Sequence, residues 1–520
     1  MGEHGIFAAA LVIAAAVLLG RGLAARLRVP DAVVLVLLGG AAGFIPGIPQ
    51  IHVSPYLVLF GILPPLVYHA AFFTAPREAR AEAVPIITLA FGLTAVTTAA
   101  VAATVHGVLP EVGWAVALAF GAAIAPTDAV AATAVMQRLG APPRLVTILE
   151  SESLINDGVA LTIFGLALKS LSTPSTPGHV LIRLVQVVVG GVAYGLVVAA
   201  LARRLRRRFR DPRSQIVLSL AIPYLAYLPA ESMGVSGVLA AVTAGFYLGT
   251  RPEGLLQPAS RLAGQVFWDV LIFLLESALF VLLGLQIHGV LEQVGGHSWR
   301  TLALAAVAVT VVAVAVRVVW ELAVQPLVRL LPGRHRGLAG LDWRVRLVIG
   351  LSGLRGAISL AIALSLPLDI GPERGVLIFL TAVVVIVTLV GQAPILPPLM
   401  RAFGLVETDL RHLELTRARK DMIESALARL EELAADEKID DRTADAFRQP
   451  LELRLDRLRA QLDEDYATAE ELPDTQRLRK ELFGVQRDRL ASLYRKGRIS
   501  ADTLRTIGDE LTFQEAGTRR

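Results

Sequence analysis

Long apolar runs, separated by short stretches that carry charge, fill the first 400 residues of the chain. Most runs have about 17–25 residues, the length of helix that crosses the hydrocarbon core of a bilayer. The pattern predicts an all-α polytopic membrane protein. Its thirteen expected spans lie near residues 5–25, 30–46, 53–73, 84–107, 111–136, 145–168, 179–202, 214–230, 233–250, 265–290, 301–328, 347–367 and 375–400.

The pattern changes after residue 401, where the apolar runs stop. Residues 402–520 hold 22 Lys+Arg and 26 Asp+Glu, mixed along stretches with helical periodicity. We therefore expect a transmembrane domain over 1–401 and a helical tail over 402–520. Helix breaks are expected near 438–441, 472–474 and 496–500. A regulatory tail and a solvated helical hairpin or coiled coil without separate activity are both compatible with this pattern.

Basic residues concentrate in alternate loops between the predicted spans. Six alternate loops hold twenty Lys+Arg, whereas the opposite loops hold only Lys169, Arg300 and Arg374. Cytoplasmic loops carry such an excess, so we expect a plasma-membrane protein with its N-terminus outside and its tail cytoplasmic. The densest loop, RRLRRRFRDPR at 203–213, is better explained as a topology anchor beside anionic lipid than as a nucleic-acid site. No nucleic-acid partner is predicted.

Two of the predicted spans are interrupted near their middles. The span 111–136 contains Pro126, which removes a backbone N–H, and the span 347–367 contains three glycines around Arg355. If the seventh span links two halves of six, the broken spans are the fifth members of each half. That position predicts inverted repeats with a transport site at the two breaks, while two unrelated kinks are the alternative.

The predicted span 145–168 carries carboxylates although it is otherwise apolar. Glu150, Ser153 and Asp157 are spaced i, i+3 and i+7, so they share one helix face. At 1.5 Å per residue, Asp157 lies near the membrane midplane, at the same depth as Asp128. This face is a candidate cytoplasmic route to Asp157, with Glu150 at its entrance.

Glu152 lies on a different face of the same helix and needs a buried cation as partner. An unpaired carboxylate at that depth is costly, so we expect a structural ion pair. The candidate cations from the residues alone are Arg317 and Arg355, and Glu321, one turn after Arg317, competes for the first of them.

Asp157 and Asp128 have too few arginines nearby for both to be neutralised by ion pairs. Burial in an apolar cavity disfavours a charged carboxylate, so such a group takes up either a proton or a hard cation. Oxygens of Thr127, Ser153 and Asn156 can complete a cation shell. This arrangement predicts exchange of H⁺ for a monovalent cation, most simply Na⁺, with Li⁺ and K⁺ open. Polar packing between helices is the structural alternative.

Composition excludes several other classes of site. The chain is 54% hydrophobic, has no cysteine and scatters its nine histidines, so thiolate and clustered-histidine metal sites are not expected. We expect neither enzymatic activity nor a cofactor. A cation channel is the first alternative, and an intramembrane aspartyl hydrolase using Asp128 and Asp157 is the second, although its Gly-x-Gly-Asp segment is missing.

Several motifs carry a family resemblance. The chain resembles bacterial members of the monovalent cation/proton antiporter family, the sodium/proton exchangers of the electroneutral Asn-Asp type. The matching segments are LPPLVYHAAF (63–72), APTDAVA (125–131), ESLINDG (152–158), FWDVLIFLLESALFVLLGLQI (267–287) and GLRGAISLAIAL (353–364).

The resemblance implies a mobile core domain that moves against a dimerisation domain, and one-for-one exchange. It implies that Asp157 binds the ion beside Asn156, that Thr127 and Asp128 supply ligands from the broken helix, and that Ser153 assists. Lipid and a second copy of the chain are the implied partners besides the cation and the proton.

The resemblance also implies a pair between Glu152 and Arg317, and a role for Arg355 in offsetting charge at the second break. The chain departs from some relatives at His69, where an acid is found elsewhere, and at Glu276-Ser277. His69 is either a pH-dependent modulator or a neutral buried side chain. Gly39/Gly43 and Gly191/Gly195 are candidates for dimer-forming helix surfaces.

Overall fold

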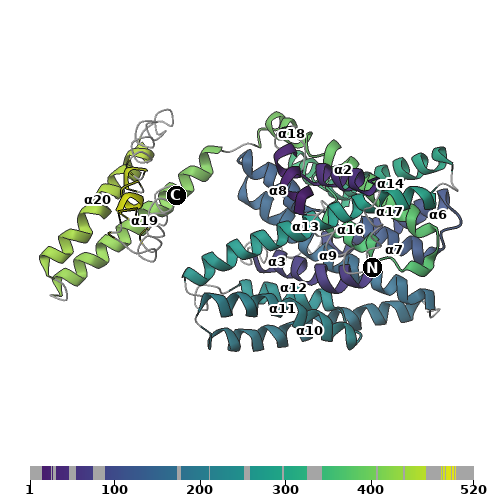
Figure 1. Ribbon diagram of the computed structural model, residues 1–520, viewed down its shortest axis with the longest axis horizontal. Coiled ribbons are helices and arrows are strands. Elements are labelled where there is room, and N and C mark those ends of the chain that lie inside the picture. Colours follow the sequence, from purple (N-terminus) through teal and green to yellow (C-terminus); the bar gives the residue numbers. More distant parts are fainter. Residues whose placement is uncertain are drawn as a thin grey trace. The chain divides into compact units, whose positions relative to one another are not determined.

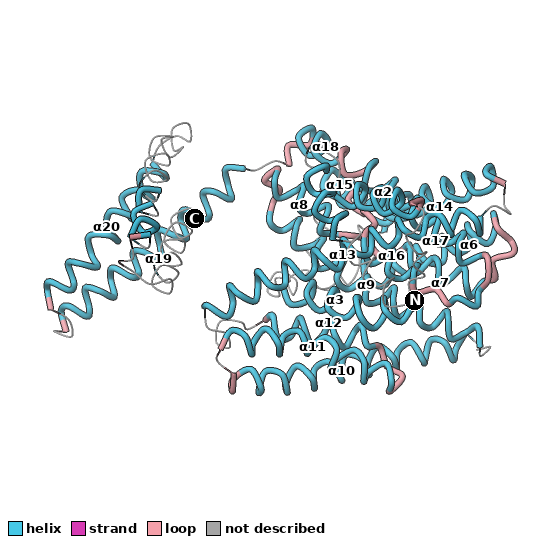
Figure 2. The backbone as a smooth tube through the Cα atoms, viewed as in Figure 1, coloured by secondary structure: helices cyan, strands magenta, loops and turns pink. Residues whose placement is uncertain are grey.

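The computed structural model describes residues 14–24, 26, 31–45, 54–73, 88–172, 177–209, 211–250, 258–294, 298–324, 342–405, 408–436 and 440–463, with scattered positions between 482 and 507. Over these residues the regular structure is helical and no strand occurs (Figure 2). This confirms the predicted all-α class for the described part of the chain. Two compact units are formed, Met1–Glu407 and Thr408–Arg520.

The first unit is a bundle of helices (Figure 1). After a helix over residues 14–24 come α2 (Asp31–Gly43), α3 (Leu63–Phe73), α6 (Thr94–Val108), α7 (Trp114–Ile124), α8 (Ala129–Arg138), α9 (Pro143–Ser172), α10 (Pro177–Arg206), α11 (Pro212–Ser232), α12 (Gly237–Gly249), α13 (Pro258–Val294), α14 (Trp299–Val319), α15 (Trp343–Leu351), α16 (Ala357–Leu364), α17 (Glu373–Gly391) and α18 (Leu396–Ala402). The π-helical turns η1 (Leu57–Ile62), η2 (Thr88–Leu93) and η3 (Trp320–Val324) extend α3, α6 and α14, and a short 3-10 turn, η6, covers Leu368–Ile370.

Two groups of helices pack within this unit. In one, α10, α11 and α12 lie side by side, α12 packs on α3, and α2 packs on α13. In the other, α6, α7, α9, α14, α16 and α17 pack together, and α13 also contacts α16 and α17. The helices α3, α9 and α13 therefore bring side chains from both groups to the same region.

Length and apolar composition fit a membrane-embedded bundle. Among the described residues, six helical segments are long and apolar enough to cross a bilayer, and five shorter apolar helices accompany them. Outward faces of α10 and α14 expose apolar side chains, as lipid contact requires. Examples are Val185, Val189, Leu196, Leu304, Val307 and Val311. Each of the thirteen predicted spans overlaps a described helix, whereas the number that cross the membrane and the inverted-repeat relation stay predictions.

Both predicted interruptions occur in the structure. Non-helical backbone over 125–128 separates α7 from α8, and non-helical backbone over 352–356 separates α15 from α16. Pro126 has no N–H for a helical hydrogen bond, and glycines weaken the second stretch. The Asp128 N–H donates to the Leu354 carbonyl oxygen at 2.6 Å, so the two breaks are in direct contact.

The glycine pairs suggested as dimer surfaces are used inside the chain instead. A Cβ at Gly43 would come within 2.9 Å of the Leu285 carbonyl oxygen, and Gly39 likewise lies against the α13 backbone. A Cβ at Gly191 or Gly195 would come within about 2.6 Å of backbone oxygens on the α12 side. The interpretation of these stripes as dimer surfaces was wrong, because their small residues allow close approach of helices within one chain.

The second unit contains α19 (Thr408–Ala435) and α20 (Asp441–Asp463), which pack on each other. Ile423, Leu455 and Leu458 form their buried contact, and Arg459 pairs with Glu424 at 3.1 Å. The break predicted near 438–441 falls between these helices. The break predicted at 472–474 lies outside the described residues, and the one at 496–500 lies largely outside them.

Candidate functional site

Helix ends of opposite polarity meet at the two breaks. The C-terminal ends of α7 and α15 present carbonyl oxygens with partial negative charge, and the N-terminal ends of α8 and α16 present N–H groups with partial positive charge. Such ends need compensating charges when they are buried.

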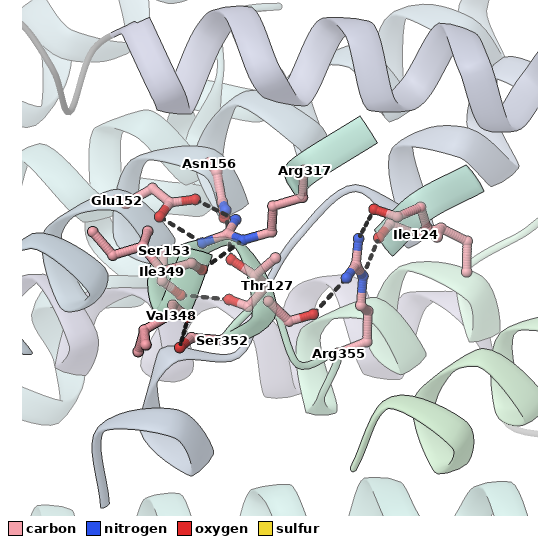
Figure 3. A network of polar contacts seen from close by, with 12 residues as sticks. Ile124, Thr127, Glu152, Ser153, Asn156, Arg317, Val348, Ile349, Ser352 and Arg355 are labelled. Carbon is pink, nitrogen blue, oxygen red and sulfur yellow. Dashed lines mark hydrogen bonds and ion pairs between the residues drawn. The ribbon is translucent and has the colours of Figure 1, made fainter. Parts of the chain in front are cut away.

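Arg355 supplies the positive charge. Its side chain is 1% exposed. Its Nε donates to the Ile124 carbonyl oxygen at the end of α7 at 3.3 Å, its Nη2 donates to Ala313 O at 3.1 Å, and its Nη1 donates to the Gly353 carbonyl oxygen (Figure 3). The Ile124 and Gly353 carbonyls are at the two breaks and lack helical donors, so the guanidinium satisfies them, while its bond to Ala313 links it to α14.

Asp128 supplies the negative charge. It directly precedes α8, and its carboxylate lies against Gly356, the residue before α16. An anion there is stabilised by the N-terminal ends of both half-helices. Opposite charges on Asp128 and Arg355 therefore match the opposite helix ends.

Side chains of α9 hold the first break in place. Ser153 Oγ donates to the Thr127 carbonyl oxygen at 2.6 Å, and Asn156 Nδ2 donates to Thr127 Oγ1 at 3.0 Å (Figure 3). From the other side, Ser359 Oγ in α16 donates to the Pro126 carbonyl oxygen at 3.4 Å. The irregular backbone thus has specific partners, which fix the direction of its remaining oxygens.

A cavity of about 440 Å³ opens beside this break. From α9 it is lined by Glu150, Ser153 and Asp157, the three residues whose spacing places them on one helix face. Thr127 and Asp128 line it from the break. The structure therefore brings together the carboxylates and hydroxyls that the sequence identified as candidate cation ligands.

Two acceptor atoms beside the cavity lack hydrogen-bond donors. Asp157 is 5% exposed and Asn156 is 2% exposed. Within the described part of the chain, neither Asp157 Oδ1 nor Asn156 Oδ1 accepts a hydrogen bond. Buried oxygens normally have partners, so a proton or a cation is the natural partner of the Asp157 carboxylate, and a cation is a natural partner of the Asn156 amide oxygen.

The facing wall of the cavity contains acids that the sequence reasoning did not assign to the site. Asp269 and Glu276, both from α13, line the same cavity. Asp269 was not singled out, and Glu276 was noted only as a departure from relatives. Their i, i+7 spacing within an apolar span was the available signal, because it places two acids on one helix face.

His69 lines the cavity from α3 and is half-buried. Its ring packs against Phe73 and Trp268, with centroid distances of 4.7 and 5.8 Å. The residue is therefore placed where it can affect ions in the cavity, and its role as a modulator stays a prediction.

Glu152 points away from the cavity toward Arg317. Two contacts of 2.5 and 2.8 Å join their side chains, which are 1% and 2% exposed (Figure 3). Arg317 Nε also donates to the Ile349 carbonyl oxygen at 3.3 Å. The pair therefore ties α9 to α14 and α15. Glu321, the rival partner, is fully buried, and its two carboxylate oxygens accept no hydrogen bond within the described residues.

Gly356 allows the two breaks to meet, which gives a steric prediction. A Cβ at this position would lie 2.7 Å from both Cβ and Cγ of Asp128. We expect Gly356→Ala to displace Asp128 at a cost of about 1–3 kcal/mol and to raise the apparent Michaelis constant for cation on the order of tenfold. Cation-dependent proton flux in proteoliposomes measures this constant.

Gly165→Ala is the matched control for this prediction. It lies on α9, and a Cβ there meets no atom within 4 Å. This variant should retain wild-type kinetics. Wild-type kinetics for Gly356→Ala as well would show that Asp128 moves aside freely.

Comparisons with known proteins point to one family. Residues 11–402 match the family model described as the transmembrane sodium/hydrogen exchanger. An uncharacterized Na⁺/H⁺ exchanger of Mycobacterium tuberculosis, Rv2287, is 33% identical over 453 residues, covering 84% of this chain and 82% of that protein. The low-affinity Na⁺/H⁺ antiporter NhaS1 of Synechocystis is 30% identical over 493 residues, covering 92% and 90%.

A solved structure shares the fold. The sodium proton antiporter MjNhaP1 from Methanocaldococcus jannaschii superposes with a TM-score of 0.62 at 21% identity, covering 76% of this chain and 98% of that one.

Proposed function

Because the chain belongs to the transmembrane sodium/hydrogen exchanger family, we propose that its exchange of cation for proton carries one Na⁺ against one H⁺. The match confirms the family predicted from the sequence motifs. The relatives are exchangers and antiporters, so this chain is a multi-pass membrane transporter and not an enzyme.

Asp157 is the proposed group that takes the proton and the cation in turn. The observation that supports it is the pair of buried acceptors, Asp157 Oδ1 and Asn156 Oδ1, that lack donors within the described residues. Asp128 and oxygens of Thr127 and Ser153 would complete the cation shell, since hard cations prefer such ligands. Na⁺ is the proposed cation, with Li⁺ and K⁺ as alternatives because they use the same oxygen ligands.

The proposed cycle is alternating access. Thirteen spans in two inverted repeats of six would place the two breaks at equivalent positions, and a core domain would move against a dimerisation domain in a homodimer. The loop charges favour a plasma-membrane protein with its N-terminus outside and residues 402–520 as a cytoplasmic tail. Contacts with lipid follow from the apolar outer faces of α10 and α14.

A channel and a hydrolase differ from this proposal in measurable ways. A channel would pass cation without moving protons in the opposite direction, and an intramembrane aspartyl hydrolase would cleave a substrate with Asp128 and Asp157. The similarity to exchangers and antiporters favours coupled transport.

One-for-one exchange predicts no net charge movement. Dye-reported proton flux and solid-supported-membrane current should be recorded on the same proteoliposomes, with Na⁺, Li⁺ and K⁺ in turn. We expect proton flux without sustained current, and no change in flux when a membrane potential is imposed. An electrogenic cycle would gain about 2.3 kcal/mol per charge per 100 mV.

The outcomes separate the candidate mechanisms. Sustained current in proportion to proton flux would exclude one-for-one stoichiometry while leaving antiport intact. Current that needs no proton gradient and exceeds the proton flux would favour the channel. Protein-free liposomes give the leak that must be subtracted.

A further inference from the structure

A second pocket, which shares Phe73 with the lining of the transport cavity, lies among α3, α10, α11 and α13. Its volume is about 280 Å³, and its polar lining includes Arg206, Gln215, Ser260 and Arg261. Tyr68 and Phe72 add aromatic walls. We propose that this pocket binds a phosphate ester that carries a hydroxyl group, either as a lipid headgroup or as a soluble ester.

Arg206 is the main reason for this assignment. It is 3% exposed, and within the described residues no carboxylate pairs with it and its Nε has no hydrogen-bond partner. Its Nη2 donates to Tyr68 Oη at a long 3.3 Å, and its guanidinium lies 5.4 Å from the centre of the Phe72 ring. A buried guanidinium with an unused N–H suits an oxyanion.

The first turn of α13 adds donors to the same pocket. Ser260 and Arg261 line the pocket from the helix that begins at Pro258. The N–H groups of a first turn have no intrahelical acceptors, and phosphate binds such ends. Ser260 is 3% exposed, and its Oγ has no partner within the described residues. Arginine and helix end thus present donors to one small space.

Gln215 is the reason for proposing that the ligand carries a hydroxyl group. Its Nε2 donates to the carbonyl oxygens of Arg206 and Phe209. Gln215 lines the pocket, and its Oε1 accepts no hydrogen bond among the described residues. An oxyanion alone cannot satisfy this acceptor, whereas a glycerol hydroxyl can.

The position of Arg206 at the end of α10 explains part of its burial but not the whole arrangement. A cation is stabilised by a helix C-terminus and by an aromatic face, and it can serve as a topology anchor. Those roles leave the Arg206 Nε and the Ser260 Oγ without partners. Both residues line the pocket, so a phosphate bound there would offer an acceptor to each of them.

The test uses the full-length protein in nanodiscs of neutral phosphatidylcholine. Phosphatidylglycerol in the bilayer and soluble glycerol 3-phosphate are the two probes, because both carry a phosphate ester and a hydroxyl. Native mass spectrometry counts retained lipid, and thermal unfolding reports stabilisation by either probe. We expect at least one probe to bind and to raise the unfolding temperature.

Variants locate the binding. Arg206→Gln should weaken the apparent affinity about 10- to 100-fold, as loss of hydrogen bonds to a charged group implies. Ser260→Ala removes no charge and should weaken the affinity severalfold. It tests the same pocket if Arg206→Gln does not fold. Arg207→Gln, at an exposed neighbouring position, is the matched control and should bind as wild type does.

Each outcome decides the proposal. Binding of phosphatidylglycerol alone identifies a lipid site, binding of glycerol 3-phosphate alone identifies a soluble ligand, and mutual competition shows that both share the pocket. Binding of neither probe overturns the proposal. If Arg206→Gln and Arg207→Gln lose the same amount of affinity, the binding reflects only surface attraction by the basic loop. The same conclusion follows if Arg206→Gln and Ser260→Ala both bind as the wild type does.

Discussion

Asp157→Asn should yield a folded protein that does not exchange cation for proton. The substitution keeps the size of the side chain but removes the carboxylate that a proton or a cation can occupy. Asp157 is 5% exposed and lines the cavity, and its Oδ1 accepts no hydrogen bond within the described residues. We expect Na⁺-dependent proton flux to fall to the level of protein-free vesicles, because an amide cannot bind both ions in turn.

Folding of this variant must be measured alongside transport. Thermal unfolding in detergent should be at or above the wild-type temperature, because removing an unpaired buried charge costs no packing. Asp369→Asn makes the same chemical change in the exposed η6 turn, away from the cavity, and should transport as wild type does. Flux retained by Asp157→Asn would remove Asp157 from the exchange mechanism.

The helix breaks and the polar face of α9 were predictable because their causes are local. Pro126 lacks an N–H whatever surrounds it, and closely spaced glycines weaken a helix in any context. The face shared by Glu150, Ser153 and Asp157 follows from helical periodicity alone. Both features depend on residues close in sequence, so no tertiary information was needed.

Features that depend on distant contacts were not predictable from the residues alone. The partner of Glu152 stayed open among buried cations until a family resemblance suggested Arg317, because sequence spacing does not say which helix lies opposite. The same limit hid Asp269, which joins the cavity only because α13 packs against α3 and α16. It also explains why the Gly39/Gly43 stripe was assigned to a dimer surface, although it packs against α13.

Glu152→Gln should destabilise the fold more than it affects cation affinity. Glu152 and Arg317 are nearly fully buried and are joined by two short contacts, and Arg317 also reaches the Ile349 carbonyl oxygen. Removing one partner of such a pair costs about 3–5 kcal/mol, because the other charge stays buried without compensation. Neither residue lines the transport cavity, so the apparent Michaelis constant for cation should change little in the protein that remains folded.

Glu150→Gln is the matched control for this substitution. It makes the same change on the same helix, two residues away, at a side chain that lines the cavity. We expect its unfolding free energy to stay near the wild-type value, while any effect appears in transport. The two variants thus separate the face of α9 that stabilises the bundle from the face that meets the ions.

A double-mutant cycle tests whether the cost of Glu152→Gln comes from the pair itself. Arg317→Gln alone should be as destabilising as Glu152→Gln, because it leaves a carboxylate buried. The double variant should be less destabilised than the sum of the two, since it leaves neither charge uncompensated. Unfolding free energies from denaturant titrations in mixed micelles give the coupling. Additive losses would show that the pair contributes no coupling energy, and a stable Glu152→Gln with selectively lost cation binding would place Glu152 among the ion ligands.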